Sequence, residues 1–188
     1  MTGADRFSGD FEVVLAAAQR AAPWALERIY TALSPVVAGY LRAQGAYEPE
    51  DLTSEVFVAV LRNVGGFVGD EAGFRSWVFT IAHRRLQDER RSRGRRPALT
   101  GLTEAMDLAG PDDVETIVDR SLRTEWVRAL CEGLAPDQRD VLLLRLLGRL
   151  TIDEVAAVLG KSSVAVKALQ RRGFRAIGRV LSREEVPL

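Results

Sequence analysis

Apolar residues recur at helical spacing along most of the 188-residue chain, and no segment shows the strict alternation that marks a half-buried strand. Proline and glycine divide this pattern into segments of helical length. Pro35 is expected to kink the second segment or to restart it, because proline cannot donate the hydrogen bond of a helix interior. The predicted helices cover residues 11–22, 23–45, 49–64, 74–93, 119–133, 136–148, 151–159 and 162 onward.

The segment 97–118 interrupts the pattern, because its apolar residues show only weak periodicity apart from a short helix expected near 102–108. Its glycines, proline and scattered acids are typical of a linker. The sequence therefore predicts an all-α protein of two helical domains, 1–96 and 119–188, joined by an acidic linker.

Residues 151–179 have the pattern of a helix-turn-helix. Thr151 and Glu154 form a capping-box pair at the start of a short amphipathic helix. Gly160 supplies the left-handed residue that ends this helix, and a serine pair then restarts the chain. A short helix, a glycine turn and a second helix are the arrangement that places a recognition helix in the major groove of DNA.

The second helix of this unit is basic on one side. Its apolar residues are Val166, Leu169, Gly173, Ile177 and Val180, and the opposite side carries Ser163, Lys167, Gln170 and Arg171. From Lys161 to Arg179 there are six basic residues and no acidic residue. The alternative is a basic helical hairpin without a ligand, but the cap, turn and charge together favour DNA binding.

Charge is distributed in blocks, although the net charge of the chain is zero. From Arg84 to Arg96 seven arginines and two acids give a net charge of plus five. From Pro97 to Arg120 six acids and one base give minus five. Because acidic segments offset the basic surfaces, we expect the free protein to bind duplex DNA poorly.

Aromatic residues precede the arginine block within 74–93. Planar rings can stack on unpaired bases while guanidinium groups hold phosphates, which suits single-stranded or melting DNA. The alternative is that the aromatics are core and the arginines are solvated. The apolar spacing favours the core for Trp77, whereas nucleic acid is the favoured interpretation of the arginines.

The helix that starts at Pro49 carries a stripe of Asp51, Glu55 and Val58, on a different side from its core-facing residues such as Leu52. An acidic stripe with an apolar neighbour suits docking on a basic partner helix. A solvated face is the commoner meaning of such a stripe, and the helix alone does not decide between them.

The chemistry-bearing residues argue against an enzyme. Cys131 is the single cysteine, so it has no disulfide or zinc partner within the chain, and His83 is the single histidine. Adjacent acid pairs lack acid–base geometry. No apolar run is long enough to span a membrane and no signal peptide is apparent, so a reducing cytosol is the expected location. A stand-alone regulator with a sensory N-terminal domain remains an alternative.

Two blocks of the sequence resemble bacterial sigma factors of the sigma-70 family. DLTSEVF resembles their DLTQEVF motif, and FRSWVFTIAHRRLQDERRSRGRR resembles F-x-x-W-L-x-x-I-A-x-N-x-x-x-D-x-x-R-R. Downstream, LAPDQRDVLLLRLLGRLTIDEVAAVLGKSSVAVKALQRR resembles their L-P-x-x-Q-R and V-K segment. The order and spacing of the blocks match the extracytoplasmic-function (ECF) group, which has only the second and fourth sigma domains.

This resemblance implies a role in promoter recognition, with no cofactor, metal or chemistry of its own. It implies core RNA polymerase, promoter DNA and an anti-sigma factor as partners of a chain that is otherwise monomeric. The loop 65–73 would capture a flipped base of the −10 element. The residues implied are Asp51, Leu52, Glu55 and Val58 for polymerase, Phe67, Phe74, Trp77, Arg84, Arg85, Asp88 and Arg91 for the −10 element, and Ser163, Lys167, Gln170, Arg171 and Arg172 for the −35 element.

The chain departs from the family pattern at several of these places. Ser54 stands where the family usually has glutamine, and Arg84 stands where it usually has asparagine. Ala165, Ala168 and Leu169 differ from the common T-V-K-S-R form, so the −35 preference of relatives does not transfer to this chain.

Overall fold

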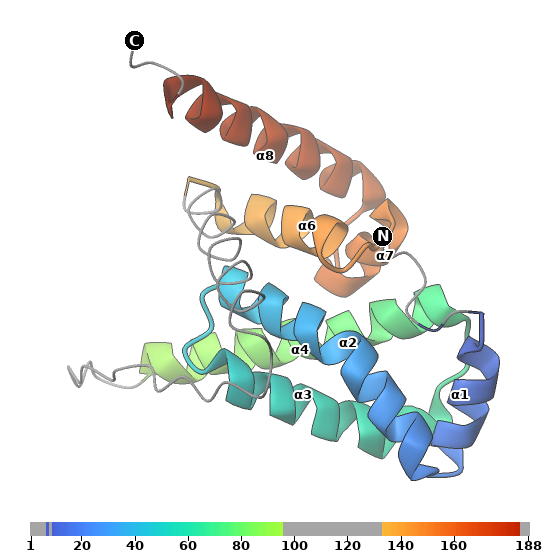
Figure 1. Ribbon diagram of the computed structural model, residues 1–188. Coiled ribbons are helices and arrows are strands. Elements are labelled where there is room, and N and C mark those ends of the chain that lie inside the picture. Colours follow the sequence, from blue (N-terminus) through green and yellow to red (C-terminus); the bar gives the residue numbers. More distant parts are fainter. Residues whose placement is uncertain (1–6, 8, 96–132, 185–188) are drawn as a thin grey trace.

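The structure, a computed structural model, describes residues 7, 9–95 and 133–184, and within this part it is all-α, as predicted. Two groups of helices pack against each other (Figure 1). The first group comprises α1 (Phe11–Gln19), α2 (Pro23–Ala43), α3 (Pro49–Asn63), a 3-10 turn (Val64–Gly66) and α4 (Glu71–Arg95), and the second comprises α6 (Pro136–Leu146), α7 (Ile152–Leu159) and α8 (Ser163–Glu184).

The first bundle is held together by the apolar stripes of its helices. In α2, α3 and α4 the apolar residues recur at three- and four-residue spacing, so each helix buries one side against its neighbours. Tyr40 and Phe79 meet edge to face in this core, with ring centroids 5.4 Å apart. The fully buried residues of this bundle are Ala25, Ile29, Val37, Tyr40, Leu41, Val56, Val60, Phe74, Val78, Phe79, Ala82 and Leu86.

Of the two outcomes expected at Pro35, a restart is excluded, because α2 is one helix from Pro23 to Ala43 with Pro35 inside it. Pro35 is exposed, whereas Leu33 and Val37 on either side of it are buried. Burial of apolar side chains on both sides of the proline therefore outweighs the single helix hydrogen bond that it removes. The predicted stop at Gly45 is confirmed, with φ of 74° at that glycine.

Helix α6 is covered on nearly all sides. Four consecutive residues, 141–144, are each at most 1% exposed, and they span about 300° of the helix circumference. A helix that is apolar all round must be enclosed. Helix α8 covers one side of α6, α2 lies on another, and α7 packs on α4, so the two bundles form one compact body (Figure 1).

Candidate nucleic-acid interface

The predicted helix-turn-helix is present, with the local geometry that its sequence implies. The Thr151 hydroxyl accepts from the Glu154 N–H at 3.3 Å, and the Glu154 carboxylate accepts from the Thr151 N–H at 2.5 Å. This reciprocal capping box starts α7, and Gly160 ends it in the left-handed conformation, with φ 63° and ψ 32°. Helix α8 follows after a three-residue connection, residues 160–162.

Helix α8 is seated closely on α6. Val166 and Leu169 are buried, as their spacing predicted. A Cβ added at Gly173 would lie 2.7 Å from Leu142 Cδ1, so only glycine permits this approach of the two helices. The apolar side of α8 therefore fixes how its opposite side is presented to solvent.

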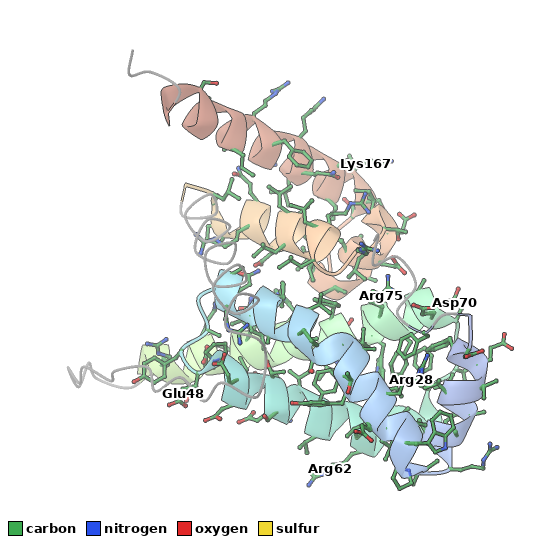
Figure 2. All side chains as sticks on the ribbon, viewed as in Figure 1. Arg28, Glu48, Arg62, Asp70, Arg75 and Lys167 are labelled. Atoms are coloured by element: carbon green, nitrogen blue, oxygen red, sulfur yellow. The ribbon has the colours of Figure 1, made fainter. Side chains whose placement is uncertain are left out.

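The opposite side of α8 is a basic, open hollow lined by Lys167, Gln170, Arg171, Phe174 and Arg175. Lys167, Arg171 and Arg175 are exposed, and Lys167 lies on the side of α8 away from the first bundle (Figure 2). Phe174 is 47% exposed in the middle of these cations, and its sequence position did not single it out. A concentration of cations around one helix suits contact with phosphates and base edges.

Ser163 has a structural contact at the start of α8. Its hydroxyl donates to the Asp153 carboxylate at 2.5 Å, which ties α8 to α7. Ser162 provides the cap instead, because its hydroxyl accepts from the Ala165 N–H at 3.2 Å. Arg172 is exposed and its Nε donates to the Ala168 carbonyl at 3.3 Å, along the surface of its own helix.

The arginines of α4 up to Arg93 are exposed or partly exposed, and several already have partners within the chain. Arg85 pairs with Glu55 of α3 at 3.5 Å, and Arg91 pairs with Asp88 one turn away. Arg93 lies over the ring of Tyr47, 4.5 Å from its centroid. The predicted −10 residues Arg84, Arg85, Asp88 and Arg91 are all exposed on this helix.

The loop before α4 exposes one apolar side chain, and contacts to α1 and α4 hold the rest of the loop in place. Val68 is 94% exposed at its tip, whereas Phe67 packs against Phe74 and Trp77, with centroids 5.0 and 5.3 Å away. Gln19 of α1 donates to the Phe67 carbonyl at 2.8 Å. A Cβ at Gly69 would lie 2.9 Å from the Phe67 ring, so the chain turns closely around that ring.

The other end of this loop is fixed by the start of α4. Asp70 accepts from the Gly73 N–H at 2.8 Å, and Glu71 pairs with Arg75 at 2.8 Å (Figure 2). The first contact satisfies a backbone donor that the first turn of a helix leaves unpaired, and the second joins two side chains one turn apart. The sequence pattern singled out the loop but not Val68 or Gln19, because neither belongs to a helical or charged pattern.

The prediction of Phe74 as a DNA contact is wrong, because Phe74 is completely buried. Its ring packs between those of Phe11 and Phe67, with centroids 5.6 and 5.0 Å away. It supports the loop from beneath and has no surface to offer a base. Trp77 is half-buried beside it, which leaves part of the indole accessible.

The acidic stripe of α3 lies on the surface. Asp51, Glu55 and Val58 are exposed, with Val58 at 48%. Leu52 is only 7% exposed and belongs to the core, so its predicted polymerase contact is wrong. The helical repeat places it about 90° around the helix from the centre of the stripe.

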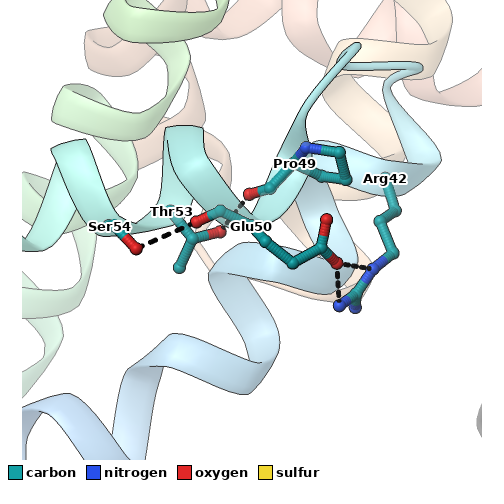
Figure 3. A network of polar contacts seen from close by, with 5 residues as sticks. All are labelled: Arg42, Pro49, Glu50, Thr53 and Ser54. Carbon is teal, nitrogen blue, oxygen red and sulfur yellow. Dashed lines mark hydrogen bonds and ion pairs between the residues drawn. The ribbon is translucent and has the colours of Figure 1, made fainter. Parts of the chain in front are cut away.

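Side-chain contacts fix the start of α3 around this stripe (Figure 3). The Arg42 Nε donates to the Glu50 carboxylate at 2.8 Å, which joins the end of α2 to α3. The hydroxyls of Thr53 and Ser54 donate to the carbonyls of Pro49 and Glu50, at 2.6 and 3.1 Å. Glu50 thus pairs with Arg42 and Glu55 pairs with Arg85, while Asp51 and Glu55 both lie on the exposed side of α3.

A buried polar cluster joins the two bundles. It comprises Tyr40, Gln44, His83, Arg90 and Asp140, which we call the interdomain cluster. The Gln44 amide donates to the Asp140 carboxylate at 2.6 Å, the Tyr40 hydroxyl and His83 Nδ1 lie 2.9 Å apart, and the Arg90 guanidinium donates to the Gln44 carbonyl at 2.7 Å.

Burial controls the protonation of this cluster. It lowers the pKa of His83, with Asp140 acting in the opposite sense and Arg90 in the same sense. Burial and the nearby Asp140 raise the pKa of Tyr40 well above its ordinary value. Both side chains are therefore neutral at pH 7, and they act as hydrogen-bonding groups around the Asp140 carboxylate.

The linker 97–118, the helix expected over 119–133 and Cys131 lie almost entirely outside the described residues. Within the described ranges no group of three histidine, cysteine or acidic side chains is placed to hold a metal ion. Searching the same ranges, we find no helix with the length and apolar character needed to cross a bilayer.

Two helical bundles, a basic helix-turn-helix in one and an arginine-rich helix beside a fixed loop in the other, define a DNA-binding protein. Residues 29–96 match the family Sigma-70 region 2, and residues 124–177 match Sigma-70, region 4. The chain belongs to the ECF group of the sigma-70 family.

Individual relatives agree with this assignment. The ECF RNA polymerase sigma factor BldN of Streptomyces coelicolor is 35% identical over 162 residues, which are 84% of this chain and 60% of BldN. The ECF RNA polymerase sigma factor ShbA of Streptomyces griseus is 33% identical over 128 residues, covering 66% of this chain and 67% of ShbA. The chain thus spans about three fifths to two thirds of the length of these relatives.

A solved structure shares the fold. CnrH in complex with the cytosolic domain of CnrY matches with a TM-score of 0.67 at 20% identity, over 93% of this chain and 99% of CnrH. At this level of identity the likeness concerns the fold alone.

Proposed function

We propose that this protein binds core RNA polymerase and directs it to promoters, with the first bundle reading the −10 element and the second reading the −35 element. The observation that supports the proposal is the presence of two separate surfaces with exposed basic side chains, on α4 and on α8, in a chain of the ECF sigma family. Catalysis of RNA synthesis is left to the polymerase, so the protein contributes recognition and no chemistry of its own.

The −35 element is read by the hollow on α8. Lys167, Gln170 and Arg171 reach the major groove from one side of the helix, and Arg175 and Arg172 hold phosphates nearby. Ser163 acts through its bond to Asp153, which sets the angle between α7 and α8. Phe174 adds an apolar surface that suits a thymine methyl group or a sugar.

The −10 element is read by α4 and by the loop before it. Val68 enters the space of a displaced base, and Phe67 and Trp77 give the loop an aromatic support on which a base can stack. The arginines of α4 hold the phosphates of the same strand. Phe74 contributes only by supporting Phe67.

Polymerase docks on the exposed stripe of α3. Asp51 and Glu55 face a basic surface of the polymerase, and Val58 provides an apolar contact beside them. Two charges next to one exposed apolar side chain suit a polar-rimmed interface. A cytoplasmic anti-sigma factor is the second protein partner that we propose, consistent with the solved complex of CnrH with the cytosolic domain of CnrY.

The proposal is tested by gel filtration of the purified chain with core bacterial RNA polymerase, followed by run-off transcription on genomic fragments. Co-elution and promoter-dependent transcripts are expected. Specific duplex binding by the chain alone, without binding to core, would instead identify a stand-alone regulator and overturn the proposal.

A further inference from the structure

Val164 is the most exposed large apolar side chain among the described residues of the second bundle, at 77%. It is the second residue of α8. Helix formation does not account for a valine at this position, because β-branched residues are weaker helix formers than the unbranched alternatives. Packing within the chain does not account for it either, because so exposed a side chain buries almost no surface.

Val164 points directly away from the rest of its bundle. The helical repeat places it about 180° from Gly173, nine residues later. Gly173 is seated against α6, since a Cβ there would lie 2.7 Å from Leu142 Cδ1. The same repeat places Arg171 and Arg175, both exposed, within about 20° of Val164. Val164 therefore begins a row along the middle of the outward side of α8, and two arginines continue this row.

The position of Val164 along the helix suits contact with base edges. A recognition helix enters the major groove with its N-terminal residues against the bases. Helical side chains also lean toward the N-terminus of their helix, so a short side chain in the first turn is directed toward the bases. Arg175 lies about three turns further along, where a long cationic side chain suits the phosphates.

The polar residues beside Val164 are already engaged within the chain. The Ser162 hydroxyl accepts from the Ala165 N–H at 3.2 Å. The Ser163 hydroxyl donates to the Asp153 carboxylate at 2.5 Å. The first turn of α8 therefore presents the two methyl groups of Val164 as its outward contact. Among the four bases only thymine presents a methyl group in the major groove, and it favours an apolar partner there.

We propose that Val164 determines specificity at one base pair of the −35 element by packing against the methyl group of a thymine. The inference rests on the function proposed above and names a contact that the cations of α8 do not make. Lys167 and Arg171 donate hydrogen bonds to acceptors on the base edges, whereas Val164 recognises hydrocarbon. The two kinds of contact thus read different base pairs.

The test uses the full chain bound to core bacterial RNA polymerase, with promoter fragments randomised over the −35 region. Sequencing of the bound fragments gives the base preference at each position. We expect the unchanged chain to enrich thymine at a position where Val164→Ser loses this enrichment, with the other positions unaffected. Val164→Thr keeps one methyl group and should retain part of the preference.

Replacement of that thymine by deoxyuridine isolates the contact, because uracil lacks only the methyl group. Affinity of the unchanged complex should fall about fourfold, the factor expected for one buried methyl-sized group. The Val164→Ser complex should bind both fragments equally. Val13→Ser is the matched control, since it makes the same change at a valine of α1 that is 63% exposed. The control should keep the fourfold response to uracil.

Two results would overturn the inference alone. One is equal weakening of every −35 sequence by Val164→Ser, which would indicate a contact with the DNA backbone. The other is a thymine preference, or a response to uracil, that Val164→Ser leaves unchanged. Failure of the unchanged chain to bind core polymerase or to select any −35 sequence would overturn the proposed function together with this inference. The two failures are thus distinguished in one experiment.

Discussion

Reversing the charges of Asp51 and Glu55, the two outward-facing acids of α3, is expected to weaken binding to polymerase while the bundle stays folded. Asp51→Arg combined with Glu55→Arg changes the charge of the stripe by four units while keeping every buried residue. Glu55 pairs with Arg85 at 3.5 Å with both side chains about half exposed, so the loss of this pair costs about 0–1 kcal/mol.

Asp51 adds a second small term to stability. It lies in the first turn of α3, where a negative charge favours the helix dipole by about 0.3–1 kcal/mol. The combined cost of the two reversals is therefore about 2 kcal/mol, against the roughly 5–15 kcal/mol that holds a domain folded. We expect the bundle to stay folded, with a melting temperature lowered by no more than about 10 °C.

The effect on polymerase binding should be far larger. Two cations set against a basic surface introduce like-charge repulsion, which we expect to weaken binding roughly a hundredfold or more. The assay is titration of labelled protein with core polymerase by fluorescence anisotropy, with circular dichroism on the same sample. Glu12→Arg with Glu27→Arg is the control, because it reverses two exposed acids on α1 and α2. Wild-type affinity in the α3 variant would refute the assignment of this face, and unfolding would refute the stability argument.

Three further variants or conditions test other parts of the structure. Lys167→Ala with Arg171→Ala should lower run-off transcription from promoters that need a −35 element about 10- to 100-fold. Binding to core polymerase, measured by gel filtration, should be unchanged. An equal loss at promoters that lack the element would contradict the assignment of α8. Gly173→Ala should destabilise the second bundle by about 1–3 kcal/mol in thermal melts, because its Cβ would lie 2.7 Å from Leu142. Gly178→Ala is the control and should be neutral or stabilising, because its Cβ would meet nothing within 4 Å. Lowering the pH from 7.5 should reduce the melting temperature once the pH falls below about 6.5, because His83 is held neutral in the fold whereas the unfolded chain binds the extra proton. His83→Gln should flatten this pH profile, since His83 is the only histidine of the chain. An unchanged slope in the variant would show that His83 is not the titrating group.

The sequence was most informative where a structure is determined by neighbouring residues. The helix-turn-helix could be predicted in detail, because Thr151, Glu154 and Gly160 determine the ends of α7 through contacts three or four residues away. The apolar sides of α3 and α8 could be predicted for the same reason, since the helical repeat alone sets which residues are buried.

Features that depend on distant contacts could not be predicted. Gln44 and Asp140 are 96 positions apart, and each resembles an ordinary surface residue of its own helix. Phe74 was misjudged because an aromatic residue before an arginine block suits both a base contact and a core, and only the packing of Phe11 and Phe67 around it decides. The exposure of Val68 could not be predicted from a sequence pattern, because it results from the neighbouring Phe67 turning inward.

The internal pairs of the α4 arginines make DNA binding an exchange of partners. A phosphate that approaches Arg85 or Arg91 displaces Glu55 or Asp88, and one that approaches Arg93 competes with the ring of Tyr47. At these three arginines each contact with duplex DNA would replace an existing one, so they would add little net affinity. Under the proposed −10 reading, a strand that also places a base against the loop would gain a contact that this exchange does not cancel, and the pairs would then favour opened promoter DNA over duplex DNA.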